Sequence, residues 1–154
     1  MRRTRRSRSE TSSTYVGRGY YAGTIFHRVI PGFMIQGGGL DATLARQAGR
    51  AAPADHGTNR RTGSANDVGT VAMARTSGPD SATSQFFINV RSNDFLNKGR
   101  SQDGVGYAVF GRVVGGMDVV RTDRAGADWN ARGHHRTCPT RDDLDRVGRG
   151  RAPT

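Results

Sequence analysis

The residues able to build a hydrophobic core are concentrated in the middle of this chain of 154 residues. Of its 26 Leu, Ile, Val and Phe residues, 23 lie between residues 20 and 120. A segment must bury apolar surface to offset the conformational entropy lost on folding, so the two ends are not expected to fold alone. The sequence therefore predicts one domain over residues 15–120, an Arg-rich disordered arm over 1–14 and an irregular or disordered tail over 121–154.

The composition argues against several other classes of protein. None of the apolar runs approaches the length of a membrane-spanning helix, about 20 residues, and no apolar segment of a signal peptide follows the basic residues 1–18. We therefore expect no membrane partner. The only cysteine, Cys138, cannot form an internal disulfide, which favours a reducing, cytoplasmic location. His134, His135 and Cys138 have a loosely metal-like spacing, but a zinc site needs further ligands, so we expect no metal.

The positive charge lies mostly on the ends of the chain. The formal net charge is +11, of which +5 falls on residues 1–19 and +3 on residues 121–154. The run RRTRRSR at residues 2–8 is able to hold nucleic acid by releasing counterions, but it contains no aromatic residue to stack on bases. We interpret it as a solvated tail and do not expect nucleic acid as a partner. An Arg-rich nucleic-acid binder remains one alternative.

The clearest strand signal is Thr24–Ile30, which is dense in β-branched and aromatic residues. Its alternation predicts that Phe26, Arg28 and Ile30 share one face of the strand. His27 falls on the opposite face. We interpret it as a packed or hydrogen-bonded histidine rather than a catalytic one.

Further short strands are expected along the rest of the middle segment. Extended chain resumes at residues 33–36, and Gly37, Gly38 and Gly39 are then expected to break it. Residues 40–68 are polar and weakly periodic, which indicates a long surface loop. The remaining expected elements are strands at residues 69–75, 84–90 and 106–114, a turn at 93–97 and a helix start at 116–120. Short strands with long loops and little helix favour a small antiparallel β-barrel.

The residues around the first strand suggest a ligand site even without any known relative. Arg28 lies near Phe33 and Met34 in the pattern, with Gln36 and Gln85 as further polar groups. An apolar pocket with a few polar groups is the usual composition of a ligand site. No pattern indicates a nucleophile paired with a base.

Four longer motifs carry a family resemblance: FHRVIPGFMIQGGG at 26–39, GTVAMART at 69–76, SATSQFFINV at 81–90 and GYAVFGRVVGGMDVV at 106–120. Together they resemble the cyclophilin family of peptidyl-prolyl cis-trans isomerases. NDFLN at 93–97, followed by a short insertion, is similar to the bacterial cytoplasmic branch. The resemblance covers residues 15–120 with one weak gap. It implies a mainly β fold, the cyclophilin-like antiparallel barrel, with no cofactor and no metal.

The resemblance also implies roles for individual residues. Arg28 matches the catalytic arginine. The positions that match the wall of the proline pocket are Phe33, Met34, Phe87 and Leu96. Gln36 matches a polar group that holds the arginine or the substrate carbonyl. The positions that match contacts to the peptide backbone are Ala74, Arg75, Thr76 and Gln85, and many relatives read Ala-Asn-Ala at the first three.

Two further substrate-binding positions bear on drug binding. Phe95 stands where many eukaryotic members have Trp, and Tyr107 stands where they have His; bacterial members commonly make both changes. Because the family's Trp contributes to binding of the immunosuppressant cyclosporin, the resemblance implies only weak binding of that drug.

The ends of the chain depart from the family pattern. The family places two strands and a helix before the strand that contains Phe26. Those elements and their loops need about forty residues, whereas 25 precede Phe26, and residues 15–21 match only the end of the helix. Residues 121–154 show no apolar alternation for a closing strand. We therefore expect an incomplete barrel that lacks its N-terminal strands and its closing C-terminal strand, as in a truncated or frame-disturbed gene product. Unpaired edges would then make it marginally stable and prone to aggregate.

These observations lead to one main hypothesis and two alternatives. The main hypothesis is a prolyl isomerase that acts on X–Pro segments of proline-containing peptides and of unfolded or nascent proteins, and so assists folding. The first alternative is an inactive truncated fragment that at most binds proline-containing peptides. The second is the nucleic-acid binder described above.

Overall fold

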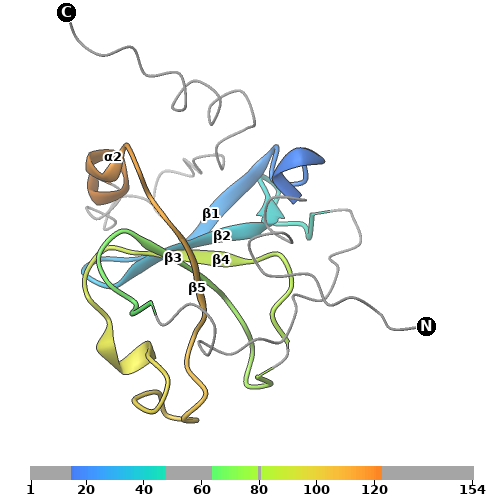
Figure 1. The fold of residues 1–154 in the computed structure, drawn as a ribbon. Helices are drawn as coiled ribbons and strands as arrows, with labels where there is room; N and C mark the ends of the chain where they lie inside the picture. The colour runs from blue at the N-terminus through green and yellow to red at the C-terminus, as the bar shows by residue number, and fades with distance from the viewer. Residues whose placement is uncertain (1–14, 48–63, 80, 123–154) are drawn as a thin grey trace, which may run out of the picture.

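The protein is mainly antiparallel β-sheet (Figure 1). The computed structural model describes residues 15–47, 64–79 and 81–122. In this part of the chain five strands form one sheet in the order β1-β2-β4-β3-β5, and every neighbouring pair is antiparallel. The elements are β1 (Thr24–Ile30), β2 (Met34–Asp41), β3 (Thr70–Met73), β4 (Phe86–Asn89), the 3₁₀ turn η1 (Asp94–Leu96), β5 (Val109–Arg112) and α2 (Met117–Thr122).

Several predictions concern residues that lie outside the described ones. These are the arm at residues 1–14, residues 123–154 of the tail and residues 48–63 of the long loop. The missing barrel strands therefore stay a prediction. Among the described residues, no helix has the length and apolar character needed to cross a membrane. No group of three or more His, Cys, Asp or Glu suited to a metal ion occurs in the same part of the chain.

Alternation along the strands gives the sheet two different apolar faces. One face carries the tyrosine cluster, whose buried members are Tyr15, Tyr21, Phe26, Ile35, Ile88 and Val90. The other face carries the site cluster, whose buried members are Met34, Ala72, Phe87, Leu96 and Val109. Adjacent residues such as Phe87 and Ile88 point to opposite clusters, so each strand contributes to both faces at once.

The segment before β1 packs its tyrosines onto the sheet. Residues 15–17 are helical, and residues 18–23 form turns that lead into β1. The Tyr21 hydroxyl donates to the backbone oxygen of Ser84 at 3.0 Å, and its ring meets Phe86 edge to face at 5.5 Å. These contacts fix the start of β1 against the strand that carries part of the site.

The prediction that the three consecutive glycines break the second strand is wrong. β2 runs through Gly37, Gly38 and Gly39 and ends at Asp41. The glycines serve close packing: a Cβ on Gly38 would lie 2.8 Å from the Phe86 ring, and Gly38 has a φ of +81°. Small residues are needed at this point because side chains from the neighbouring segments lie directly on the strand.

The predicted faces of β1 also need correction. The register shifts between Phe26 and Arg28, since Phe26 pairs with Gly37 while Arg28 pairs with Gln36. Such a β-bulge reverses the alternation within one strand. Phe26 therefore packs in the tyrosine cluster, whereas Ile30 packs against the site cluster. Arg28 and Ile30 do not share a face with Phe26 as the alternation had predicted.

Candidate active site

One row of cross-strand neighbours crosses the sheet on the face of the site cluster. Arg28 on β1 pairs with Gln36 on β2. Gln36 pairs with Phe87 on β4, and Phe87 pairs with Ala72 on β3. Side chains directly opposite each other in a sheet lie about 5 Å apart at Cβ. The sheet itself therefore brings the predicted catalytic arginine next to the predicted apolar pocket.

Arg28 is the end of a hydrogen-bonded series, the arginine–glutamine chain (Arg28, Gln36 and Gln85). Nη1 of Arg28 donates to Oε1 of Gln36 at 3.4 Å, and Nε2 of Gln36 donates to Oε1 of Gln85 at 2.8 Å. The guanidinium is exposed while both glutamines are half-buried. Gln36 is thus held in one orientation, with its oxygen turned towards the arginine.

The position of Gln85 depends on a glycine that the sequence analysis did not recognise as part of the site. A Cβ on Gly39 would lie 2.5 Å from Cγ of Gln85 and 2.6 Å from its Nε2. Any larger residue there would occupy the space of the Gln85 side chain. The only signal in the sequence is the run of three glycines, which by itself predicts the end of a strand.

The site cluster contains six of the residues predicted to bind substrate: Phe33, Met34, Ala74, Phe87, Leu96 and Tyr107. Met34, Phe87 and Leu96 are buried, and the other three are partly buried against them. The Phe87 and Tyr107 rings meet edge to face at 5.8 Å. Phe95 joins at the rim, because its ring lies 5.5 Å from that of Phe33 while the residue is 48% exposed.

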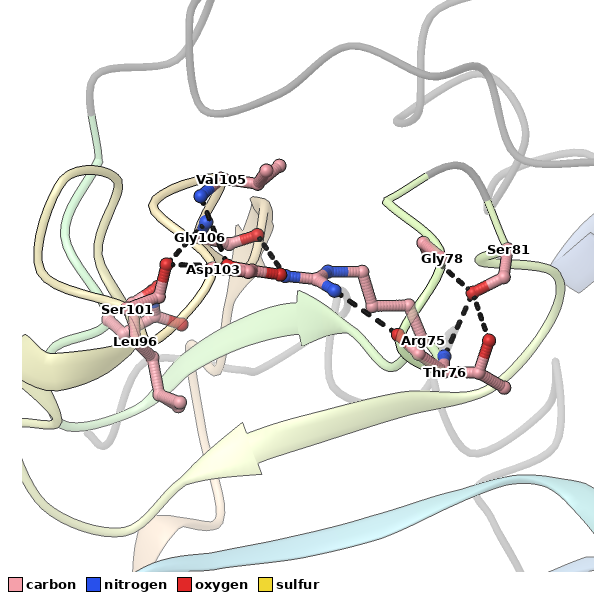
Figure 2. A network of polar contacts seen from close by, with 10 residues as sticks. Arg75, Thr76, Gly78, Ser81, Leu96, Ser101, Asp103, Val105 and Gly106 are labelled. Atoms are coloured by element: carbon pink, nitrogen blue, oxygen red, sulfur yellow. Dashed lines mark hydrogen bonds and ion pairs between the residues drawn. The ribbon is translucent and has the colours of Figure 1, made fainter.

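Residues 74–76 leave the end of β3 and run beside the start of β4. The backbone N–H of Ala74 donates to the backbone oxygen of Gln85 at 3.0 Å. The N–H of Thr76 donates to the Ser81 hydroxyl at 2.9 Å, and that hydroxyl donates to the backbone oxygen of Gly78 at 2.7 Å (Figure 2). The segment predicted to align the peptide is therefore fixed at both of its ends.

An open groove of about 560 Å³ lies beside the site cluster. It is lined by Arg75, Thr76, Ser77, Phe95, Leu96, Ser101, Gln102, Asp103 and Tyr107. Five of these residues were predicted to bind substrate. None of the lining residues belongs to the arginine–glutamine chain, so the groove extends the site away from Arg28.

The two walls of the groove are joined by an ion pair between Arg75 and Asp103 (Figure 2). The Arg75 side chain is only 6% exposed, and its guanidinium carbon lies 4.5 Å from the centre of the Tyr107 ring. Hydrogen bonds from the Ser101 hydroxyl and from Arg75 hold the pKa of Asp103 well below its usual range. The carboxylate is therefore charged at any physiological pH.

Buried amides behind the site cluster were also missed by the sequence analysis. Asn66, Asn89 and Asn93, which we call the asparagine network, are fully buried. They bond to one another through their side chains. Their remaining side-chain N–H groups donate to the side-chain oxygens of Thr70 and Asn97 and to the backbone oxygens of Phe33, Leu96 and Tyr107. The network thus fixes the backbone of three residues of the site. Its only sequence signal was a polar residue inside the apolar strand FFIN.

Comparison with known proteins agrees with this fold and identifies the family. Residues 9–134 match the sequence profile of the cyclophilin type peptidyl-prolyl cis-trans isomerases. The chain belongs to the cyclophilin family. Relatives include a peptidyl-prolyl cis-trans isomerase of Acinetobacter baylyi, 58% identical over 107 residues that make up 70% of this chain and 54% of that protein. Peptidyl-prolyl cis-trans isomerase B of Escherichia coli is 49% identical over 129 residues, covering 83% of this chain and 76% of that protein.

Solved structures show the same likeness. The crystal structure of the cyclophilin AquaCyp293 from Hirschia baltica matches with a TM-score of 0.57 and 27% identity, over 73% of this chain and 57% of that one. A Cryptosporidium parvum cyclophilin crystallised in the presence of the dipeptide Ala-Pro matches with a TM-score of 0.52 and 28% identity, over 73% and 69% of the two chains. The chain spans about half the length of the Acinetobacter relative.

Proposed function

We propose that this chain accelerates cis–trans isomerisation of X–Pro peptide bonds. One observation carries the proposal: an exposed guanidinium, oriented through Gln36, stands in the same cross-strand row as the apolar site cluster. We expect a proline ring to pack against the site cluster, which places the ring nitrogen close to Arg28. Family membership supports the same activity.

Rotation about the X–Pro bond requires no nucleophile, but it is accelerated by a cationic hydrogen-bond donor at the prolyl nitrogen. An X–Pro amide resists rotation because its nitrogen shares a lone pair with the carbonyl, which gives a barrier of about 20 kcal/mol. In the twisted state this conjugation is lost and the lone pair stays on nitrogen. A guanidinium N–H that donates to the lone pair stabilises the twisted state over the planar one. Only such selective stabilisation raises the rate.

Each part of the site has a task in this mechanism. Arg28 donates to the prolyl nitrogen, and arginine suits the task because it stays protonated in proteins. Gln36 holds the guanidinium. The site cluster excludes water from the ring, which strengthens the electrostatic contact. Residues 74–76 and Gln85 hold the peptide backbone on either side, so that rotation is confined to the X–Pro bond.

The proposed substrates are exposed X–Pro segments of unfolded or nascent proteins in the cytoplasm, where the protein acts as a folding helper. An open groove beside the site cluster suits an extended chain better than a folded surface. We also propose that cyclosporin binds weakly, because an exposed Phe95 offers less surface than Trp at this position.

The direct test is isomer exchange of an Ala-Pro peptide, measured by nuclear magnetic resonance. We expect wild-type protein to accelerate exchange and Arg28→Ala to lower kcat/KM about a hundredfold, the usual cost of removing one group that stabilises the transition state. Arg112→Ala, which removes an exposed arginine of β5, is the matched control and should retain activity. Equal activity of Arg28→Ala and wild type would refute the role of the arginine.

Two other results would favour the alternatives. Peptide binding without isomerisation by wild type would support an inactive fragment. Binding of nucleic acid that weakens steeply with salt, and that is lost when residues 1–14 are deleted, would support the Arg-rich binder.

A further inference from the structure

The groove beyond the site cluster has a wall that no role in the isomerisation yet explains. That wall is the insertion loop, residues 97–106, which faces residues 75–77 across the groove. We propose that Asp103 of this loop is a positioning residue for the isomerase: it holds Arg75, and through Arg75 it holds the backbone of residues 74–76 against which the peptide aligns. The proposal rests on the proposed function.

The guanidinium of Arg75 is the link between the two walls (Figure 2). Its Nη1 donates to the backbone oxygen of Thr76 at 3.1 Å. Its Nη2 donates to the Asp103 carboxylate and to the backbone oxygen of Gly106, the latter at 3.3 Å. The buried Nε has no hydrogen-bond partner within the described residues. The orientation of Arg75 is therefore set by the two Nη groups and by the Tyr107 ring.

Asp103 presents its carboxylate from a loop that is fixed by its own contacts. One carboxylate oxygen accepts from the Ser101 hydroxyl at 2.8 Å and from the Val105 N–H at 3.0 Å. The Gly106 N–H donates to the same Ser101 hydroxyl at 2.8 Å. Gly106 has a φ of +79°, and a Cβ there would lie 2.6 Å from the backbone nitrogen of Lys98. The position of the carboxylate is thus supported by contacts within the loop that do not involve Arg75.

A charge at Asp103 is required because Arg75 is nearly buried. Without the carboxylate, the guanidinium would face only neutral carbonyl oxygens and the face of an aromatic ring. A buried charge that loses its partner is strongly unfavourable where it lies. The side chain is therefore expected to move towards water. Arg75 carries the backbone of residues 74–76 with it, so the expected effect is a displaced binding segment rather than a lost chemical group.

The placement of the groove determines which kinetic constant should change. Leu96 and Tyr107 belong both to the groove and to the site cluster. A peptide with its proline in the site cluster therefore lays its neighbouring residues along the Arg75 wall. That contact is made with planar and twisted peptide alike, and loss of such uniform binding raises KM and leaves kcat unchanged.

The test compares two ion pairs of the same region. Asp103→Asn keeps the shape and an oxygen for Ser101 and Val105 but removes the charge. We expect a rise in KM of about fivefold for an Ala-Pro peptide, the upper range for a partly exposed pair, with unchanged kcat. Arg100→Gln breaks the exposed pair between Arg100 and Asp94, whose side chains are 68% and 62% exposed, and should leave both constants unchanged.

A double-mutant cycle tests whether Asp103 acts through Arg75. If it does, Arg75→Gln combined with Asp103→Asn binds peptide no worse than Arg75→Gln alone, since the second change then removes nothing further. If instead the double variant loses as much binding free energy as the two single variants together, the proposal is overturned. So would a KM of Asp103→Asn equal to that of wild type.

Hydrogen exchange separates this proposal from the proposed function. The Thr76 amide should exchange faster in Asp103→Asn than in wild type and Arg100→Gln, because its segment is loosened. This readout needs no isomerase activity. Absence of isomerisation by wild type would therefore refute the proposed function alone, whereas unchanged exchange at Thr76 would refute the positioning role even in an active enzyme.

Discussion

Gly39 offers a way to disturb the arginine–glutamine chain without touching any of its members. In Gly39→Ala the new Cβ would lie 2.5 Å from Cγ of Gln85, whereas carbon atoms in contact rest about 3.5–4.0 Å apart. Gln85 must therefore move by about 1 Å. The hydrogen bond from Gln36 to Gln85, now 2.8 Å long, would be stretched beyond normal hydrogen-bond length and therefore broken.

The cost follows from that one hydrogen bond. A neutral hydrogen bond contributes about 1 kcal/mol, which corresponds to about fivefold in rate. We expect kcat/KM of Gly39→Ala to fall by that factor in the exchange assay, since Gln36 no longer holds Arg28 in one orientation. Unfolding by urea should show no matching loss of stability, because Ala is otherwise more favourable than Gly within a strand and Gln85 is a flexible side chain.

Gly111→Ala is the matched control for this experiment. Gly111 lies in β5, and a Cβ there would make an ordinary contact 4.0 Å from Cβ of Val71. Its kcat/KM should equal that of wild type. If Gly39→Ala also retained full activity, the orientation of Gln85 would have no part in the reaction, and the mechanism would need only Arg28 and the site cluster.

Three further changes test other parts of the structure. Asn93→Asp places an acceptor-only carboxylate where the side chain now donates to the backbone oxygen of Phe33; unfolding by urea should show a loss of about 3 kcal/mol, and an unchanged midpoint would argue against the asparagine network. Phe95→Trp should tighten cyclosporin binding in a fluorescence titration, and equal affinity would contradict the account of weak binding. Burial lowers the pKa of His27, so the unfolded state takes up a proton first as pH falls below about 6.5. Stability should therefore be complete above that pH and decline below it. His27→Gln should remove this part of the decline in thermal unfolding measured from pH 8 to pH 5, and an unchanged slope would exclude His27 as its source.

Local patterns predicted those parts of the fold that depend on neighbouring residues in the sequence. The bounds of β1 agree with the predicted strand to the residue, because its β-branched and aromatic side chains have no competing signal. The β-bulge within β1 was not predictable from alternation alone, since the register is set by the partner strand. The same holds for Gly39, whose role depends on Gln85 approaching from a distant part of the chain.

The sequence motifs predicted the residues of the candidate site itself. They did not predict the residues that hold those site residues in position. The twelve predicted residues fall into the arginine–glutamine chain, the site cluster and the groove. Asn66 and Asp103 lie in segments for which the resemblance offered no role. Their importance comes from what they bond to: backbone oxygens of Leu96 and Tyr107 in one case and a buried guanidinium in the other. Pairings of this kind arise only in three dimensions.

A backbone hydrogen bond joins the two residues that flank the insertion loop, so the loop sequence can be replaced. The Tyr107 N–H donates to the backbone oxygen of Leu96 at 2.8 Å, so the chain enters and leaves the loop at one hydrogen-bonded point. Protein engineers could graft loops of other lengths and sequences between Asn97 and Tyr107, keeping Asn97 because its side-chain oxygen accepts from the buried Asn66. A library of such grafts, each retaining an acidic residue opposite Arg75, would be a direct route to variants that favour chosen sequences around proline.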